Sequence, residues 1–129
     1  ADSGQKPGSE AEVSVNLPER DYCILITKKT LGTGSDELGA LLMRSYFTAL
    51  NELANLPRNI FFINEGVHLT TEGSKCLDLL RDLEHKGVAI LSCGTCLDYY
   101  NLKNKVEAGK VTNMYDIVDT ITRIRTITL

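Results

Sequence analysis

The sequence predicts an α/β domain, a three-layer sandwich in which a mostly parallel five-stranded sheet lies between helices. Short apolar runs alternate along the chain with segments whose apolar residues recur at helical spacing. The runs are nearly continuous in apolar residues, which is typical of strands covered on both faces. Strands that alternate with helices imply right-handed crossovers, and therefore a parallel sheet of the flavodoxin/Rossmann type.

Length and composition indicate one folded domain. The chain has 129 residues, of which 43% are hydrophobic and 24% charged, and this is enough to bury a core. Residues 1–20 combine glycine, proline and charged residues without an apolar period, so we expect a linker or disordered tail there. The α/β domain is expected over residues 21–129. Because the first residue is not Met, we also expect a longer parent protein or processing.

The first half of the domain contains two predicted strands and one helix. The apolar run 22–26 is the first strand and 59–63 is the second. Between them a helix is expected over 35–53, with Ser35 as its cap and acidic residues in its first turn. The helical stripe comprises Leu38, Leu41, Leu42, Ser45, Tyr46, Ala49, Leu50 and Leu53.

The second half continues the alternation of helices and strands. After a turn-rich stretch at 64–68, glycine at 87 stops a helix that buries Cys76, Leu77, Leu80 and Leu83. The expected elements are a helix over 71–86, a strand over 88–92, a short helix over 97–106, a short strand at 111–112, a helix capped by Asn113, and a terminal strand over 125–129.

Cys93 and Cys96 form a Cys-Gly-Thr-Cys motif directly after the predicted strand 88–92. Open α/β sheets place ligand and catalytic groups at the carboxyl ends of their strands, and a thiol near a helix N-terminus is favoured as the reactive thiolate. We therefore predict a functional site at this turn, against the alternative of two small residues that only pack there. Thioredoxin-like sites also place such a motif between strand and helix, but normally after an early strand.

The remaining cysteines and the histidines carry weaker signals. Cys23 and Cys76 are spaced as core residues, so we expect free thiols in a reducing, cytoplasmic compartment rather than disulfides. His68 falls in a loop at the same sheet edge as the motif, where it can relay a proton or simply be solvated. His85, in the last turn of a helix, complements the helix dipole. Tyr99 and Tyr100 are expected to pack rather than react.

Several classes of function are not favoured. Zinc would need two ligands beyond the cysteine pair, and the spacing of the other cysteines and histidines does not supply them, so no metal site is predicted. A Gly-Thr-Gly loop at 32–34 resembles a phosphate cradle, but Asp36 and Glu37 would repel a phosphate, so no cofactor is predicted. The net charge of −3, with scattered basic residues, does not favour nucleic acid. No apolar stretch is long enough for a membrane span.

Blocks of sequence, in a particular order, identify a family. They are GSDELG at 34–39, NEGVHLT at 64–70 with EGS at 72–74, CGTCLDYY at 93–100 and VTNMY at 111–115. With these blocks, residues 22–129 resemble the DsrE-like sulfur-relay family. The chain looks most similar to the C-terminal domain of YedF-type proteins, which are described as sulfurtransferase-like and linked to selenium metabolism.

The resemblance implies a role for each thiol. Cys93 matches the position at which DsrE-like relay proteins accept sulfane sulfur as a persulfide and hand it on. Cys96 looks like an addition of this subfamily that resolves the persulfide as a disulfide or shares the cargo. Relatives usually have glycine where this chain has Asn101, another residue that tolerates left-handed geometry.

The resemblance also implies partners. YedF-type proteins usually begin with a TusA-like domain, so residues 1–20 look like the linker after it, and a TusA-like sulfur-carrier domain is the expected partner. DsrE-like relatives commonly form oligomers, so a homo-oligomer is expected. Side chains on loops at the same sheet edge are expected to line a pocket beside the thiols, namely Asn64, Glu65, Gly66, His68, Gly94, Thr95, Asn113 and Met114.

Two other functions remain open from the sequence. A non-catalytic module that binds a small ligand or a partner domain would have inert thiols or a stable disulfide between Cys93 and Cys96. A dithiol oxidoreductase would show a measurable exchange potential without persulfide uptake.

Overall fold

The computed structural model describes residues 21–129, and the predicted linker or tail at 1–20 lies outside them. The helices and strands are, in chain order, β2 (Tyr22–Ile26), α1 (Asp36–Asn51), β3 (Asn59–Phe62), the 3-10 helix η1 (Asn64–Leu69), α2 (Leu77–His85), β4 (Ala89–Cys93), α3 (Gly94–Tyr99), the 3-10 helix η2 (Lys103–Lys105), β5 (Lys110–Thr112), α4 (Met114–Ile121) and β6 (Arg125–Thr128).

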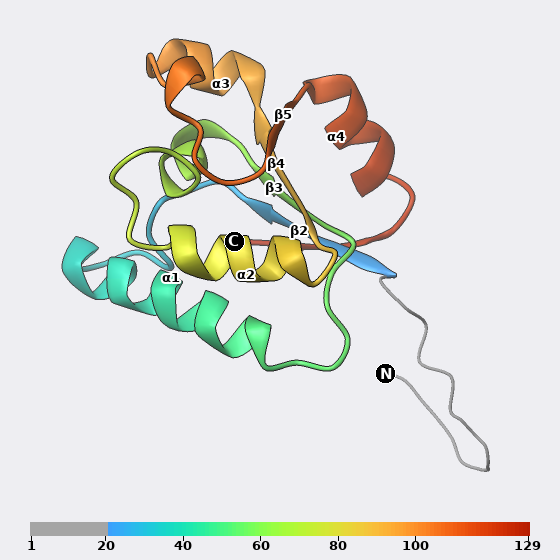
Figure 1. Ribbon diagram of the computed structural model, residues 1–129, viewed down its shortest axis with the longest axis horizontal. Helices are drawn as coiled ribbons and strands as arrows, with labels where there is room; N and C mark the ends of the chain where they lie inside the picture. Colours follow the sequence, from blue (N-terminus) through green and yellow to red (C-terminus); the bar gives the residue numbers. More distant parts are fainter. Residues whose placement is uncertain (1–20) are drawn as a thin grey trace.

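The strands form one parallel five-stranded sheet in the order β5-β4-β3-β2-β6 (Figure 1). The predicted α/β class and parallel sheet are therefore confirmed. From β2 to β5 each crossover moves the chain one strand in the same direction, and α4 then returns it to the other side of β2. This return makes β6 an edge strand beside β2.

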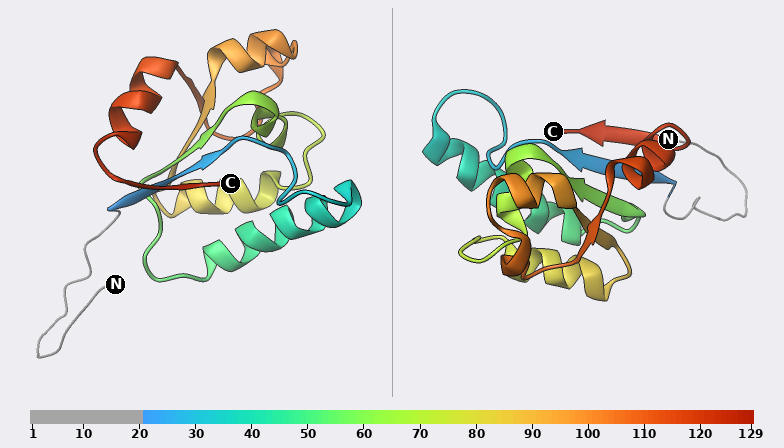
Figure 2. Two further views of the ribbon diagram at one scale, coloured as in Figure 1. Left: turned by 180° about the vertical axis from the view of Figure 1, so that it is seen from behind. Right: turned by 90° about the horizontal axis from the view of Figure 1, so that it is seen from above.

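Two layers of helices enclose the sheet (Figures 1 and 2). On one face, α1 and α2 bury Met43, Phe47 and Leu80 against alternate residues of the central strands. On the other face, α4 places Ile117 over Cys23, Phe61 and Cys93. Successive residues of a strand point to opposite faces, which is why Cys93 lies beneath α4.

The buried face of α1 differs from the apolar stripe of the sequence. Leu50 is buried as predicted, but Leu38, Leu41 and Leu42 are exposed, and the helix also buries Gly39, Met43 and Phe47, which the stripe did not include. Gly39 decides the orientation, because a Cβ at this position would lie 2.7 Å from the Cβ of Thr30. Apolar residues occupy two faces of this helix, and periodicity alone predicted that the face with Leu38, Leu41 and Leu42 would be buried.

Two helices are shorter than the sequence predicts. The helix expected over 71–86 begins only at Leu77, because the Thr71 hydroxyl bonds back to the carbonyls of Val67 and His68 and Gly73 takes a φ of +91°. The helix expected over 97–106 is α3, which includes Cys96 and ends before Asn101. Asn101 has the left-handed conformation expected of it, with a φ of 58°. No helix formed by residues 21–129 is long and apolar enough to cross a membrane.

Candidate functional site

The Cys-Gly-Thr-Cys motif forms the junction between β4 and α3. Cys93 is the last residue of β4 and the N-cap residue of α3, and Cys96 lies in the first turn of that helix. Gly94 keeps the junction narrow, since an added Cβ would lie 3.3 Å from a methyl group of Val111 and 3.4 Å from the carbonyl oxygen of Thr112. The predicted strand-to-helix turn at the carboxyl edge of the sheet is confirmed.

The two thiols of the motif differ in exposure. Cys93 is only 1% exposed and belongs to the apolar cluster under α4. Cys96 is partly exposed, and both are free thiols. Cys23 and Cys76 are also free and buried, as their spacing predicted. Solvent therefore reaches the motif through Cys96.

A small polar cluster, formed by Asn64, His68, Cys96 and Tyr100, surrounds the accessible thiol. The backbone N–H of Asn64 donates a hydrogen bond to the Sγ of Cys96 at 3.1 Å. The Tyr100 hydroxyl donates to the Oδ1 of Asn64 at 3.0 Å, and the rings of Tyr100 and His68 meet edge to face with centroids 4.7 Å apart. Asn64 adopts the left-handed conformation, with a φ of 52°.

The environment of Cys96 acts on its ionisation in opposing ways. Burial raises the pKa of the Cys96 thiol above its ordinary value, the hydrogen bond from the Asn64 N–H lowers it, and the neighbouring Cys93 thiol raises it. The net direction is upward. In the resting dithiol, Cys96 thus holds its proton more firmly than a free cysteine does.

Strand register brings Asn64 to the cysteine motif. β3 and β4 are adjacent and parallel, and Phe62 pairs with Ser92, so the chain leaves both strands side by side. Gly66 allows η1 to lie close to the end of β2, because a Cβ there would be 2.4 Å from the carbonyl oxygen of Ile26. A buried hydrogen bond of 2.7 Å between the hydroxyls of Thr70 and Ser92 ties the end of η1 to β4.

The other predicted pocket residues have different surroundings. Glu65 accepts a hydrogen bond from the backbone N–H of Lys29 at 3.3 Å, and Gly66 is buried. Asn113 caps α4 by accepting from the N–H of Asp116 at 2.8 Å. Thr95 and Met114 are exposed. Of the predicted lining residues, Asn64 contacts a thiol directly and His68 reaches the cluster through Tyr100.

Tyr100 is a site residue that the sequence analysis missed. It was expected only to pack, yet its hydroxyl holds the side chain of Asn64. The signal was its position four residues after Cys96, since residues at that spacing lie on one face of a helix. Tyr99 was also expected to pack, but its side chain is 80% exposed.

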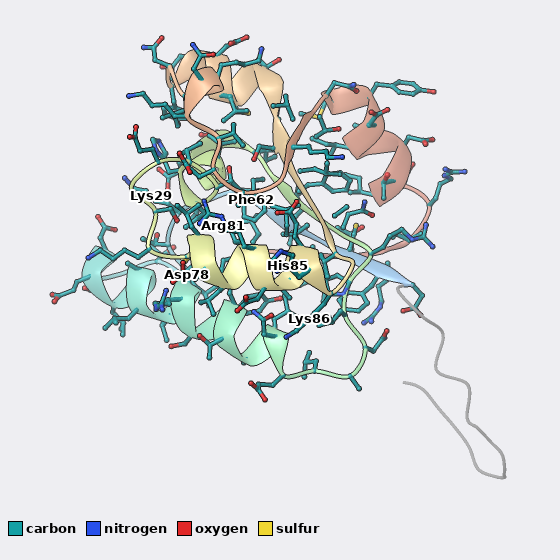
Figure 3. All side chains as sticks on the ribbon, in the orientation of Figure 1. Lys29, Phe62, Asp78, Arg81, His85 and Lys86 are labelled. Carbon is teal, nitrogen blue, oxygen red and sulfur yellow. The ribbon has the colours of Figure 1, made fainter. Side chains whose placement is uncertain are left out.

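The remaining candidates lie apart from the thiols. His85 is on α2, away from α3 (Figure 3). Among residues 21–129 no group of three or more His, Cys, Asp or Glu side chains is placed to hold a metal ion. A pocket of about 340 Å³ lies at the opposite edge of the sheet, between α1 and β6, where Tyr22, Leu53 and Arg125 contribute to its wall.

Comparison with known proteins agrees with the fold and the motifs. The model of the DsrE/DsrF-like family matches residues 21–127. The chain belongs to the DsrE/DsrF-like family. This family is associated with sulfur relay, and the family-level resemblance of the sequence is thereby confirmed. No curated protein matches the chain.

Solved structures share the DsrE-like fold at low sequence identity. The ychN protein from E. coli superposes with a TM-score of 0.62 at 17% identity, over 85% of this chain and 99% of that one. MTH1491 of Methanobacterium thermoautotrophicum, a protein of unknown function, superposes with a TM-score of 0.62 at 19% identity. The match covers 84% of this chain and 97% of that one. BT1422 of Bacteroides thetaiotaomicron, also of unknown function, superposes with a TM-score of 0.58 at 13% identity. The match covers 88% of this chain and 100% of that one. At these identities the likeness shows the fold alone.

Proposed function

We propose that this DsrE-like domain is a sulfur carrier, with sulfurtransferase-like activity, that forms a persulfide on the Cys93–Cys96 pair. The observation that carries the proposal is the pair of free thiols at the β4–α3 junction, of which one is open to solvent and receives an N–H hydrogen bond. Membership of a family associated with sulfur relay supports it.

The chemistry requires only thiols and a persulfide donor. A thiolate of the pair attacks the outer sulfur of a donor R–S–SH, the donor's sulfur–sulfur bond breaks, and R–S⁻ leaves with the electron pair. The protein then carries a cysteine persulfide. The thiolate of an acceptor repeats the attack on that outer sulfur, and the cysteine thiolate is regenerated. No oxidant or metal enters either step.

The finer parts of the proposal follow from the YedF-type resemblance. The cargo is sulfur, or selenium held in the same way. The donor or acceptor is a TusA-like sulfur-carrier domain, in the same full-length chain or separate from it. The protein acts as a homo-oligomer in the cytoplasm.

Persulfide loading tests the proposed function. The chain is incubated with glutathione persulfide, and mass spectrometry of the intact protein measures the gain of one sulfur atom. A matched control is the double variant C93A/C96A, which keeps the buried Cys23 and Cys76. Loading of the wild type but not of the control is expected. Equal loading of both, or of neither, contradicts the carrier function.

A ligand- or partner-binding module is the second candidate. The pocket of about 340 Å³ between α1 and β6 favours it, because the pocket is distant from the cysteine motif and has apolar walls beside the guanidinium of Arg125. Such a module would bind its ligand equally well after both motif cysteines are replaced by alanine. A carrier would lose its function in the same variant.

A further inference from the structure

We infer that Cys96 is the thiol that first receives the sulfur, and that Asn64 and Tyr100 position it. This inference rests on the proposed sulfur-carrier function and assigns an order within the pair. The resemblance alone gives the receiving role to Cys93. The surroundings of the two thiols support the reverse order.

Access distinguishes the two thiols. An attack on a persulfide needs the thiolate, the outer sulfur and the leaving sulfur nearly in line, so the donor must reach the attacking Sγ. Cys93 is 1% exposed and shares its cluster with Ile117 of α4, and a donor cannot reach its Sγ unless α4 moves. Cys96 is partly exposed in the folded protein, so a donor can reach it and be attacked by its thiolate without any rearrangement.

A backbone donor is aimed at Cys96. The N–H of Asn64 lies 3.1 Å from its Sγ. An N–H that donates to sulfur stabilises the thiolate more than the neutral thiol. A persulfide anion on Cys96 would remain near the same N–H of Asn64. Asn64 is the first residue of η1, so its N–H has no partner within that helix.

The side chains around Asn64 hold this donor in place. Asn64 adopts the left-handed conformation, at a φ of 52°, where the chain passes from β3 into η1, and its N–H points to the Sγ of Cys96. Its Oδ1 accepts from Tyr100, the C-cap residue of the helix that carries Cys96, and the Tyr100 ring rests against His68. The side chain thereby joins η1 to α3 beside the thiol. Asn64 and Tyr100 are positioning residues for Cys96.

The order of transfer follows from this geometry. The Cys96 thiolate attacks the outer sulfur of the donor R–S–SH, R–S⁻ leaves with the electron pair, and Cys96 becomes the persulfide. Two balanced reactions are then open to Cys93, the thiol beside Cys96. Its thiolate attacks the outer sulfur and takes the cargo into the buried cluster, or it attacks the inner sulfur, which forms the Cys93–Cys96 disulfide and releases HS⁻.

Single alanine variants test the order. Initial rates of loading from glutathione persulfide are measured for the wild type, C93A and C96A, with thermal unfolding as a check on folding. C93A is expected to load at least as fast as the wild type, because the Cys93 thiol raises the pKa of Cys96 and its removal favours the attacking thiolate. C96A is expected to load roughly tenfold more slowly or not at all, and tenfold corresponds to about 1.4 kcal/mol of barrier.

The outcomes separate the inference from the proposed function. If the wild type loads and C96A loads as fast as the wild type, the order is wrong while the carrier function stands. The same conclusion follows if C93A loses loading although it is folded. If the wild type takes up no sulfur, the carrier function fails and the inference fails with it.

Substitutions at Asn64 test the positioning role. Glycine keeps the left-handed conformation and the N–H, whereas valine is disfavoured at positive φ. The pH profile of Cys96 alkylation by iodoacetamide is expected to move to higher pH in N64V, because the lost hydrogen bond had lowered the pKa. In N64G, which keeps the N–H but loses the contact with Tyr100, a smaller shift in the same direction is expected. If N64V does not fold, N64A makes the same comparison more mildly. Identical profiles for all variants would overturn the role.

Discussion

At the scale of single residues, the neighbouring thiol of Cys93 affects how readily Cys96 ionises. Burial raises the pKa of Cys96, and the Cys93 thiol raises it further. An attacking thiol works best when its pKa is near the ambient pH. The resting pair therefore has less Cys96 thiolate than a free cysteine would, and removal of Cys93 should make Cys96 more reactive.

The variant C93A is expected to lower the pKa of Cys96. Without the neighbouring thiol, the thiolate of Cys96 no longer loses stability to that neighbour, so alkylation at neutral pH becomes faster and its pH profile moves to lower pH. The measurement is the rate of iodoacetamide alkylation against pH, with the Cys96 peptide resolved by mass spectrometry. Cys76, whose pKa is raised by burial, serves as an internal control that should not change. A profile that moves to higher pH contradicts the prediction.

Gly66 is predicted to be indispensable for the placement of η1. In Gly66→Ala the new Cβ would lie 2.4 Å from the carbonyl oxygen of Ile26, which is part of the backbone and cannot turn aside. Overpacking of this kind costs about 2 kcal/mol of folding free energy. Urea unfolding measures the loss. The control is Gly94→Ala, whose Cβ would meet the side chain of Val111, which can move. If this control loses as much folding free energy as Gly66→Ala, the backbone clash at Gly66 is not the cause.

At this scale the sequence predicted the identity of the motif but not its geometry. Cys93, Cys96, Asn64 and His68 were expected at one edge because parallel strands bring their carboxyl ends together. The hydrogen bond from Asn64 to Cys96 could not be predicted, because it depends on the register of two strands and on the path of the chain after β3. Tyr100 was expected to pack rather than react, and it does pack against the core, but its hydroxyl also holds Asn64.

At the scale of elements, α4 determines whether Cys93 is reachable. This helix is eight residues long, and Asn113 caps its N-terminus by a hydrogen bond of 2.8 Å to the N–H of Asp116. Its Ile117 lies in the same buried cluster as Cys93. A short helix draws much of its stability from such a cap and from packing, so local opening of α4 is the route by which Cys93 becomes exposed.

The variant N113A is expected to speed alkylation of Cys93 without changing that of Cys96. Loss of an N-cap costs about 1 kcal/mol, which raises the population of the open α4 several-fold. Alkylation rates of both cysteines, measured by mass spectrometry under native conditions, test this. The matched control is S35A, which removes the cap of α1, a helix on the opposite face from Cys93. Equal acceleration in both variants would show global rather than local opening.

At this scale the helix caps were predicted correctly, whereas the start of one helix and the buried face of another were not. The caps of α1 and α4 were predicted because serine or asparagine directly precedes each amphipathic segment, and both are confirmed. The start of α2 was predicted six positions too early, since the hydroxyl of Thr71 competes for backbone carbonyls that a helix would use. The buried face of α1 is decided by the contact between Gly39 and Thr30, which periodicity does not report.

At the scale of the whole molecule, the parallel sheet was predictable and the strand order was not. Continuous apolar runs alternating with helices imply crossovers and a parallel sheet. The position of β6 beside β2 depends on contacts between residues far apart in the chain, such as the 3.3 Å contact between Cys23 Sγ and Thr126 Oγ1. The resulting domain leaves leucines exposed on α1, and these provide the basis for a prediction about assembly.

The exposed leucines of α1 are predicted to form the contact between copies in the expected homo-oligomer. Leu38, Leu41 and Leu42 are 53%, 61% and 41% exposed and lie on one side of the helix. Large neighbouring apolar side chains of this kind mark association sites more often than free surface. L41E places a charge in the contact, where burial without a partner is costly.

L41E should therefore convert the oligomer to monomers, while its effect on the stability of one subunit stays within about 0.5 kcal/mol, as for most surface substitutions. Sedimentation velocity measures the mass, and urea unfolding the stability. The control is A40E, because Ala40 is exposed on the same helix but points away from the leucines. An L41E variant with the mass of the wild-type oligomer would exclude this face as the contact. A monomeric wild type would show that the domain does not assemble through these leucines alone.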